Sequence, residues 1–465
     1  MIEPVQQVLT VAAMRAVEED LIRAGTSVDA LMQIAGRGAA EWVWRVAGHH
    51  AVTVLCGPGN NGGDGYVIAE ALRARGGKVR VVEALEPKTE AARSARALYQ
   101  GDVLGPDVDV HGDVLVDCLF GSGLVRPLAP ETFALLTRLA DHHHRLIAVD
   151  LPSGVESDTG VALNEGLPEY LLTVALGAWK QAHFLMPAAA AMGQLRLVGI
   201  GCAAVAGAPG VVARPAVPIP DAETHKYRRG LLAVVGGAMP GAAELACTAA
   251  MGAGAGYVRL LSDGRAVQPR ASALVCDSRP LGEALADERI AATLVGPGLG
   301  RDGAARARLQ AAIGAGRRLV LDADALVMLR RTDAAGAALA TPHDGELAVL
   351  ERAFGLDGIG TKLDRAQALA SASGLVILAK GPDTIVAAPD GRAAFAHRAP
   401  VWLSTAGTGD VLAGIVASRL AAGLEPFAAA CEAVWLHGEA ARLAGAAFTA
   451  DDLATQVRSA YTACL

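Results

Sequence analysis

Short apolar runs rich in β-branched residues alternate with stretches of helical periodicity along the chain. In the first half these runs occupy residues 51–56, 78–85, 113–120 and 145–152. In the second half they occupy residues 229–237, 291–300, 317–326, 374–381 and 383–391. Because parallel strands need a long crossover connection, usually a helix, this alternation predicts a parallel, doubly wound sheet in the first half and a second α/β domain in the second half.

A proline-containing segment separates the two halves. Residues 212–223 contain three prolines, and strand patterns begin again at residue 229. A chain of 465 residues is also too long for a single hydrophobic core, so about two or three domains are expected. We predict a first domain over residues 1–211, a linker over residues 212–223 and a second domain over residues 224–465.

Charge and cysteine usage exclude several classes of protein. The net charge is −7, and no block of Lys and Arg is available to follow a phosphate backbone, so nucleic acid is not an expected partner. None of the seven cysteines forms a C-x-x-C pair, which fits a reduced compartment. The N-terminus is unlike a signal peptide, and the apolar runs break before the ~20 residues of a membrane span. We expect a cytoplasmic protein without a membrane segment.

The first glycine-rich segment, GPGNNGGDG at residues 57–65, follows an apolar run and precedes a helical pattern. It lacks the G-K-S/T ending of a P-loop. Asn60, Asn61 and Asp64 add side-chain oxygens to the backbone amides, whereas a plain tight turn would need only the glycines. Since open α/β sheets bind ligands at the carboxyl ends of their strands, this segment predicts a binding site.

Asp117, Asp150 and Ser153 also follow strand-like runs beside glycine-rich turns. Their oxygens can converge with that of Asn61, and oxygen ligands without Cys or His indicate an alkali or alkaline-earth cation rather than zinc. The alternative is that each residue caps the helix or turn that follows it. Lys180, farther along the chain, is either a site residue or a solvated surface lysine.

The first-half motifs resemble the YjeF-type family of NAD(P)H-hydrate epimerases over roughly residues 8–210. The shared patterns are GPGNNGGDG, D-x-x-x-G-x-G-L and V-D-x-P-S-G-V. The resemblance implies a Rossmann-like domain that binds the hydrated cofactor at Asn60, Asn61, Gly62, Gly63, Asp64, Gly121, Ser122, Gly123, Leu124, Val125, Arg126, Pro127 and Asp150. It implies that potassium binds at Asn61, Asp117 and Ser153, and that Lys180 matches a family lysine. A carboxylate such as Asp150 and a cation such as Lys180 suit the proton transfers of epimerisation.

The second half contains a glycine-rich loop that leads into a helix, at residues 404–423. A helix N-terminus attracts phosphate, and the Asp410 carboxylate beside it can deprotonate an attacking hydroxyl. The alternative is that Asp410 is only a helix cap. This G-T-G-D segment resembles the anion-hole and base motif of ribokinase-like kinases.

Other second-half segments carry further candidate residues. Lys380 and a glycine turn lie between two strand patterns, and His343 lies on a turn that opens a helix. Glycine-lined strand ends occur at residues 236–258 and 293–300. Four such elements in one domain are hard to explain by packing alone.

Together these segments resemble the ADP/ATP-dependent NAD(P)H-hydrate dehydratases over roughly residues 215–465, with a ribokinase-like fold. The resemblance implies that the hydrated cofactor binds at Ala242, Gly300, His343 and Asp410. It implies that the adenine nucleotide, with Mg²⁺, binds at Lys380, Gly381, Pro382, Asp383, Thr384 and Gly409. Three segments depart from the family pattern: TPHDGE has Asp344 where proline is usual, HKYRRG is bulkier than the usual glycine-rich version, and KGPDT replaces KGAGT.

The two resemblances together predict a bifunctional repair enzyme for hydrated NADH and NADPH, and we expect a homo-oligomer. One alternative is an ATP-dependent kinase of a small hydroxyl substrate, because such kinases share the G-x-G-D loop. Another is a non-catalytic NAD(P)-binding or scaffold protein. The attached NNGGDG segment and the TPHDGE segment argue against a kinase.

Overall fold

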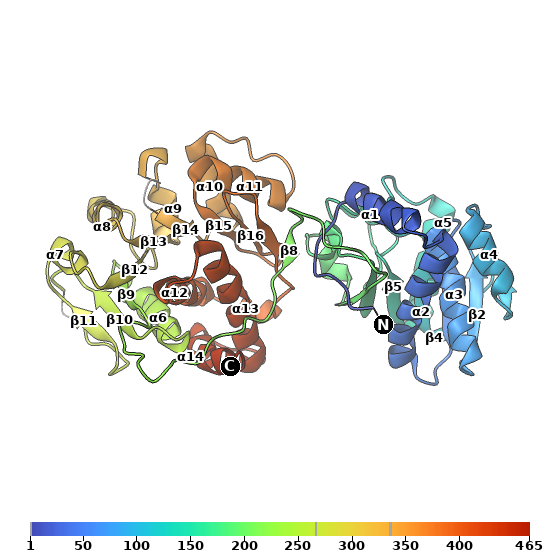
Figure 1. Cartoon of the computed structure of the whole chain (residues 1–465), viewed down its shortest axis with the longest axis horizontal. Helices are drawn as coiled ribbons and strands as arrows, with labels where there is room; N and C mark the ends of the chain where they lie inside the picture. Colours follow the sequence, from blue (N-terminus) through green and yellow to red (C-terminus); the bar gives the residue numbers. More distant parts are fainter. Residues whose placement is uncertain (1, 266, 334–336) are drawn as a thin grey trace. The chain divides into compact units, whose positions relative to one another are not determined.

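The computed structural model describes residues 2–265, 267–333 and 337–465 and divides the chain into two compact units (Figure 1). The boundary lies between Gly210 and Val211. The predicted linker, residues 212–223, therefore belongs to the second unit, where Val212 and Val217 are buried against its hydrophobic side chains.

The first unit is built on a seven-stranded parallel sheet in the order β3-β2-β1-β4-β5-β6-β7. Its strands are β1 (Val52–Cys56), β2 (Val79–Glu83), β3 (Val103–Leu104), β4 (Gly112–Cys118), β5 (His143–Val149), β6 (Leu172–Leu176) and β7 (Gln194–Val198). Its helices are α1 (Val11–Arg23), α2 (Val28–Ala47), α3 (Asn60–Ala74), α4 (Glu90–Leu98), α5 (Pro130–Asp141), η1 (Gln181–His183) and η2 (Ala188–Ala191).

Alternating side chains of the strands fill two cores, one on each face of this sheet. Val54 of β1 packs with α2 and α3 on one face, whereas its neighbour Leu55 packs with α5 on the other. This alternation follows from the two-residue period of a strand. Both faces are covered, as a parallel sheet requires.

The strand order reverses direction between β1 and β4, which both end at the same edge of the sheet. Chain connections leave the edge in opposite directions at such a point, and this opens a crevice in which doubly wound sheets bind ligands. The segment GPGNNGGDG leaves β1 there and forms the first turns of α3. The fold therefore brings the glycine-rich segment to the switch point of the sheet.

The second unit is built on a ten-stranded sheet in the order β11-β10-β9-β12-β13-β14-β15-β16-β17-β8. Its strands are β8 (Gly210–Val211), β9 (Leu231–Val235), β10 (Tyr257–Leu261), β11 (Val275–Asp277), β12 (Ile290–Val295), β13 (Arg318–Leu321), β14 (Ala337–Ala340), β15 (Val376–Ala379), β16 (Ile385–Ala387) and β17 (Ala393–Phe395). The pairings from β11 to β15 are parallel, and β15, β16 and β17 form an antiparallel meander.

Helices α6, α12, α13 and α14 pack against one another beside this sheet (Figure 1). The helices of the unit are α6 (Pro240–Gly252), α7 (Leu281–Leu285), α8 (Gly303–Gly314), α9 (Asp324–Met328), η3 (Arg331–Asp333), α10 (Asp344–Phe354), α11 (Lys362–Ser373), η4 (Val401–Leu403), α12 (Thr408–Ala421), α13 (Pro426–Ala444) and α14 (Ala450–Thr462). Many of the core contacts of α6 and α12 are made by alanines and glycines, which let the helix axes approach closely; a Cβ on Gly414 would lie 2.1 Å from the Ala246 carbonyl oxygen.

The predicted α/β fold of both halves is confirmed, and each of the nine predicted apolar runs contains a strand. All seven cysteines are free. Within the described ranges, no helix combines the length and apolar character that a bilayer span requires.

Substitution of Gly62 tests how tightly the glycine-rich turn packs. A Cβ on Gly62 would lie 1.9 Å from the carbonyl oxygen of Gly57, which is backbone and cannot move aside cheaply. Gly62→Ala should lower the free energy of unfolding of the first unit by about 1–3 kcal/mol, as overpacking typically does. Differential scanning calorimetry of the full chain measures the change.

Gly105→Ala is the matched control, because open space surrounds Gly105 and its φ lies outside the left-handed region. Its effect should stay within about 0.5 kcal/mol. Equal effects of the two substitutions would contradict this account of the turn.

Candidate functional site

A cavity of about 950 Å³ opens at the switch point of the first unit. This volume lies within the range of small-molecule and cofactor sites. Its walls include the segments that follow β1, β4 and β5, together with residues of α1. Of the residues predicted to bind hydrated cofactor, those that line the cavity are Asn60, Asn61, Asp64, Gly121, Ser122, Gly123, Leu124, Val125, Arg126, Pro127 and Asp150.

Gly62 and Gly63 are not among the lining residues. Both are buried in the first turn of α3, where a Cβ on Gly63 would lie 2.5 Å from Met32 Cε. Their lack of a side chain serves the packing of α3 against its surroundings.

Asp150 and Lys180 form a buried ion pair that lines the cavity. Lys180 Nζ lies 2.5 Å from Asp150 Oδ1 and donates a second hydrogen bond to the Leu176 carbonyl at 2.7 Å. The Lys180 side chain is only 2% exposed, so it is not the solvated surface lysine of the alternative interpretation. Burial alone would raise the pKa of Asp150, but the Lys180 ammonium outweighs it and the pKa is lowered.

The backbone at Asp150 is strained, since its φ of 66° lies in the left-handed region. Such conformations persist only where the surroundings hold them, and they cluster at functional sites. Here the Ser122 amide donates to Asp150 Oδ2 at 2.7 Å. The Asp150 carboxylate is thereby aimed between the ends of β4 and β5.

His183 is a site residue that the sequence analysis missed. Its Nδ1 accepts from the Lys180 amide at 2.9 Å, so Nε2 carries the proton that is donated to the Asp150 carbonyl at 2.8 Å. Burial, reinforced by Lys180, lowers the pKa of His183 to about 4. A neutral imidazole therefore hydrogen-bonds to the backbone of both Asp150 and Lys180. In the sequence, only the spacing of three residues between Lys180 and His183 could have indicated this role.

Two further carboxyl groups line the same cavity with pKa values shifted the opposite way. Burial raises the pKa of Asp64 well above its usual value, and the Asp150 charge adds to the shift. Burial also raises the pKa of Glu18 on α1, although Lys180 opposes it. The cavity thus places a carboxyl group with a lowered pKa beside others with raised pKa values, an arrangement typical of acid–base sites.

Asp117 and Ser153 lie buried near this cavity rather than in its lining. Asp117 accepts hydrogen bonds from the Ser153 hydroxyl at 2.7 Å and from the Tyr170 hydroxyl at 2.6 Å. The Ser153 hydroxyl also lies 3.0 Å from the Phe120 amide. Burial raises the pKa of Asp117, and these hydrogen bonds offset part of that rise. Neither residue caps α5, whose N-cap is Ala129, but Asp117 also accepts from the Leu119 amide at 3.1 Å and so caps the turn that follows β4.

Asn61 completes this group from the other side. Both polar atoms of its side chain are buried, and neither has a hydrogen-bond partner among the described residues. Its Oδ1 lies 3.2 Å from where a Cβ on Gly121 would be, and Asp150 Oδ2 lies 2.8 Å from the same point. Asn61 therefore lies beside Gly121, in the segment after β4 whose Phe120 amide donates to the Ser153 hydroxyl.

In the second unit, Lys380 follows β15 and its ammonium is buried among carboxylates. Lys380 Nζ lies 2.8 Å from Asp322 Oδ1 and 3.8 Å from Glu346 Oε2. Burial would lower the pKa of Lys380, but Asp322 and Glu346 outweigh burial and raise it. Thr341 donates to Asp322 Oδ1 at 2.6 Å. The ends of β13, β14 and β15 thus meet around one ammonium group.

Asp410 lies in the first turn of α12, whose N-cap is Gly407 with a φ of 91°. Asp410 is therefore not the N-cap of the alternative interpretation. Burial raises the pKa of its carboxyl to about 6, Asp322 adds to the shift and Lys380 opposes it. Gly409 precedes it, and a Cβ there would lie 3.6 Å from Lys380 Nζ. A carboxylate poised near neutrality at a helix N-terminus suits a general base.

His343 is the N-cap of α10, and its Nδ1 accepts from the Gly345 and Glu346 amides at 3.0 and 3.2 Å. The proton therefore lies on Nε2, on a side chain that is 61% exposed. Glu346 accepts from the His343 amide at 2.9 Å. Because Glu346 also raises the pKa of Asp410, the predicted residues His343 and Asp410 belong to one electrostatic cluster.

Ala242 lies in the first turn of α6, and Gly300 lies on the loop between β12 and α8 of the same unit. A Cβ on Gly298 would lie 3.0 Å from Ala242 Cβ. The Gly300 amide donates to Asp324 at 2.9 Å, and Asp324 also raises the pKa of Asp410. The residues predicted for this half therefore gather at one edge of the sheet.

The turn between β15 and β16 contains the predicted nucleotide-binding residues. The Thr384 hydroxyl donates to the Gly381 carbonyl at 2.7 Å and closes the turn. Gly381 and Pro382 are exposed, whereas Asp383 is buried. His437 of α13 lies 2.9 Å from the Thr408 carbonyl and supports the N-terminus of α12; the sequence analysis missed it.

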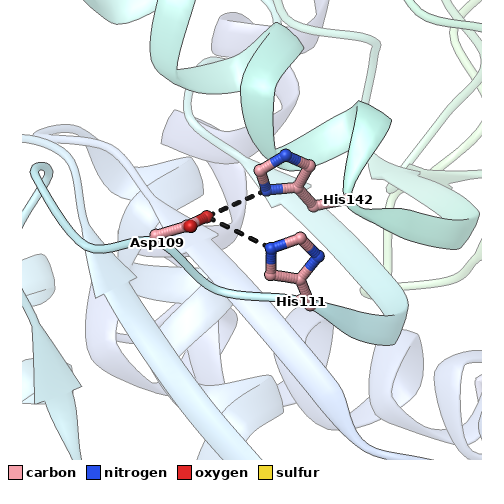
Figure 2. A group of neighbouring side chains, drawn as sticks. All are labelled: Asp109, His111 and His142. Atoms are coloured by element: carbon pink, nitrogen blue, oxygen red, sulfur yellow. Dashed lines mark ion pairs between the residues drawn. The ribbon is translucent and has the colours of Figure 1, made fainter.

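A third group, Asp109, His111 and His142, lies at the amino ends of β4 and β5, where strands of the first sheet begin (Figure 2). Asp109 Oδ1 lies 3.1 Å from His142 Nδ1 and 3.4 Å from His111 Nε2. The two rings are stacked with centroids 4.0 Å apart and planes 11° apart. A bound metal lies near the plane of each imidazole that binds it, and stacked parallel rings share no such position. We therefore assign this group no metal.

Comparisons with known proteins match both units. The family model of the YjeF-related protein N-terminus matches residues 28–182, and that of NAD(P)H-hydrate dehydratase matches residues 232–462. A bifunctional NAD(P)H-hydrate repair enzyme from Synechocystis sp. is 31% identical over 94% of this chain and 90% of its own length. One from Salinibacter ruber is 34% identical over 94% of this chain and 92% of its own length.

Among solved structures, the ADP/ATP-dependent NAD(P)H-hydrate dehydratase from Bacillus subtilis, co-crystallised with ATP and Mg²⁺, is 27% identical. The match covers 54% of this chain and 95% of that one, with a TM-score of 0.46. The two family models occur in the same order as the two structural units. This chain belongs to the family of bifunctional NAD(P)H-hydrate repair enzymes.

Proposed function

We propose that this protein repairs hydrated nicotinamide cofactors in two steps. The first unit interconverts the R and S forms of NAD(P)H hydrated at C6. The second unit dehydrates the S form to NAD(P)H at the expense of ADP or ATP, which yields AMP or ADP and phosphate. The observation that carries the proposal is the buried Asp150–Lys180 pair in a cavity of cofactor size, on a chain that belongs to the repair family.

The first cavity suits a dinucleotide in both charge and chemistry. Arg15, Lys88 and Arg126 line it and can meet the phosphates of the cofactor. Asp64, whose pKa is raised by burial, can donate a proton toward the C6 hydroxyl, while the Asp150 carboxylate can accept a proton and the Lys180 ammonium can donate one. Epimerisation requires this traffic at the same oxygen.

Potassium fits the group formed by Asn61, Asp117 and Ser153. The Asn61 amide oxygen is buried without a partner among the described residues, and Asp117 is a fully buried carboxylate. An ion with oxygen preference would satisfy the first and compensate the charge of the second. When bound, it would add positive charge that stabilises an anionic group of the ligand.

In the second unit, Asp410 is proposed to be the general base for the C6 hydroxyl. The hydroxyl attacks the terminal phosphoryl group of the nucleotide, whose phosphates meet the amides at the N-terminus of α12 and the turn at Lys380–Thr384. The carbon–oxygen bond of the phosphate ester then breaks, and loss of a ring proton restores the dihydropyridine. Phosphate is a far better leaving group than hydroxide.

Magnesium fits the carboxylates that surround Asp410, namely Asp322, Asp324 and Glu346. Carboxylate oxygens are the ligands that Mg²⁺ takes beside substrate phosphates. The bound ion would neutralise charge on the transferring phosphoryl group. The alternative of a small-molecule kinase leaves the first unit, with its buried ion pair and cavity, without a role.

A mixed hydrate tests the two steps together. With nucleotide present, the wild type should convert both epimers to NADPH, because the first unit feeds the S form to the second. Lys180→Met should stop recovery at the S fraction, since the cation beside Asp150 is lost. Absorbance of the dihydronicotinamide ring measures recovery.

Pure S hydrate is the control for the Lys180→Met variant and should be converted at the wild-type rate. Full recovery of the mixed hydrate by the variant at the wild-type rate would remove Lys180 from the mechanism.

Potassium dependence tests the cation group. Epimerase rates of the wild type should fall when choline replaces potassium at constant ionic strength. Asn61→Ala should weaken this dependence while the nucleotide-driven half stays intact, because the Asn61 side chain has no hydrogen-bond partner among the described residues to lose. Equal wild-type rates in the two salts would refute the assignment.

Asp410 gives the clearest test in the second unit. Asp410→Asn keeps the size but removes the base, so dehydration should fall by about 10²–10⁴-fold. Because the pKa of Asp410 is raised to about 6, the wild-type rate should fall as pH decreases through that value, where the carboxylate becomes protonated. Initial rates of phosphate release from S hydrate measure both effects.

The acid limb of the profile should be missing from the Asn variant, and its epimerase rate should be unchanged. An Asn variant within a few-fold of wild type would leave Asp410 without a catalytic role.

A further inference from the structure

One buried ammonium in the second unit has no part in the proposed chemistry so far. Lys362 is the first residue of α11, and its side chain is 7% exposed. Its Nζ lies 2.6 Å from Asp383 Oδ1, 2.9 Å from the Lys380 carbonyl oxygen and 3.1 Å from Asp344 Oδ1. It also lies against Gly381, where a Cβ would come within 2.4 Å of Nζ. Burying an ammonium is costly unless oxygen atoms pair with it, and here three oxygen atoms do so.

The three oxygen partners come from two different segments. Lys380 and Asp383 belong to the turn between β15 and β16, to which nucleotide binding is assigned. Asp344 is the first residue of α10 and directly follows His343, which is assigned to the hydrated cofactor. Lys362 therefore bonds to both the nucleotide turn and the cofactor loop.

The two contacts differ in environment. The Asp383 side chain is 12% exposed, so its interaction with the ammonium is little screened. The Asp344 side chain is 63% exposed, so its interaction is weaker. The hydrogen bond to the Lys380 carbonyl fixes the peptide that enters the turn. The firm attachment is to the nucleotide turn, and the cofactor loop is tied to it more loosely.

Charge explains why this turn needs a cation. Asp383 adds a negative charge to a turn that must lie beside nucleotide phosphates, and like charges close together are unfavourable. The Lys362 ammonium offsets that charge at 2.6 Å. Asp344 and Asp383 are also the positions where TPHDGE and KGPDT depart from the family pattern, so both departures contact the same ammonium.

We propose that Lys362 is a positioning residue for the adenine nucleotide. It holds the turn at residues 380–384 in its binding conformation, offsets the charge of Asp383 and links the turn to the loop that carries His343. The inference rests on the proposed function only in taking this turn as the nucleotide site.

Nucleotide binding tests the proposal without turnover. Isothermal titration of the full chain with ADP and with ATP gives Kd for each variant. Lys362→Met should raise Kd by about tenfold or more, since loss of one member of a buried ion pair is costly. Lys362→Met combined with Asp383→Asn should return Kd to within about threefold of wild type, because the offending charge is gone.

Arg365→Met is the matched control, since it also removes a cation of α11. Arg365 forms a two-point ion pair with the buried Glu351, at 2.8 Å for both contacts, rather than with a residue of the nucleotide turn. The control variant should lose stability and keep its Kd. If it raises Kd as much as Lys362→Met does, the effect comes from a loosened helix and the proposal is wrong.

Asp344 tests the link between the two segments. Asp344→Asn should raise the nucleotide Kd by about two- to fourfold, as expected for a half-exposed ion pair. In the Lys362→Met background the same substitution should leave the Kd unchanged. If the effects of Asp344→Asn and Lys362→Met on the nucleotide Kd are additive, Lys362 does not link the two segments. A Kd for Lys362→Met within threefold of wild type would overturn the positioning role.

Turnover separates failure of this inference from failure of the proposed function. A wild type that binds nucleotide but does not dehydrate S hydrate refutes the proposed function and leaves the binding test valid. A wild type that binds neither ADP nor ATP refutes both. In an active wild type, Lys362→Met should raise the KM for nucleotide far more than it lowers kcat.

Discussion

The direction of the parallel strands is the constraint on which both sites depend. Within the first sheet all strands are parallel, and within the second sheet those from β11 to β15 are parallel. In each sheet the carboxyl ends of these strands therefore meet at one edge. Residues as distant in sequence as Asn61, Asp117, Asp150 and Lys180 are therefore neighbours in space. Because the loops at that edge carry the chemistry, the sheets themselves can be filled with Val, Leu and Ala.

In both units a lysine forms an ion pair with a buried aspartate. Lys180 lowers the pKa of Asp150, whereas Asp64 in the same cavity stays raised. In the second unit Lys380 contacts Asp322 and leaves Asp410 with a pKa of about 6. In the first unit the carboxylate in direct contact with the ammonium is stabilised as an anion. In both units the neighbouring carboxyl groups have pKa values raised by burial.

Each unit also has a buried histidine that acts on backbone rather than on substrate. His183 contacts the Asp150 carbonyl, and His437 contacts the Thr408 carbonyl near Asp410. Burial lowers the pKa of both to about 4, so both are neutral at physiological pH. Neutral imidazoles can brace a catalytic turn without adding charge to it.

The sequence alone determined the two α/β domains and the strand-end location of the motifs, because strand periodicity and glycine spacing are local properties. The resemblance to a known family added part of the lining of the first cavity. Only the tertiary structure decided what depends on contacts between distant segments. Gly62 and Gly63 pack so closely against Gly57 and Met32 that no side chain would fit there. His183 supports the site because it hydrogen-bonds to the Asp150 carbonyl. Lys362 became a hub because Asp344 and Asp383, 39 positions apart in the sequence, meet at its ammonium. Side-chain burial and pairing arise from packing across the sheet, which no local pattern encodes.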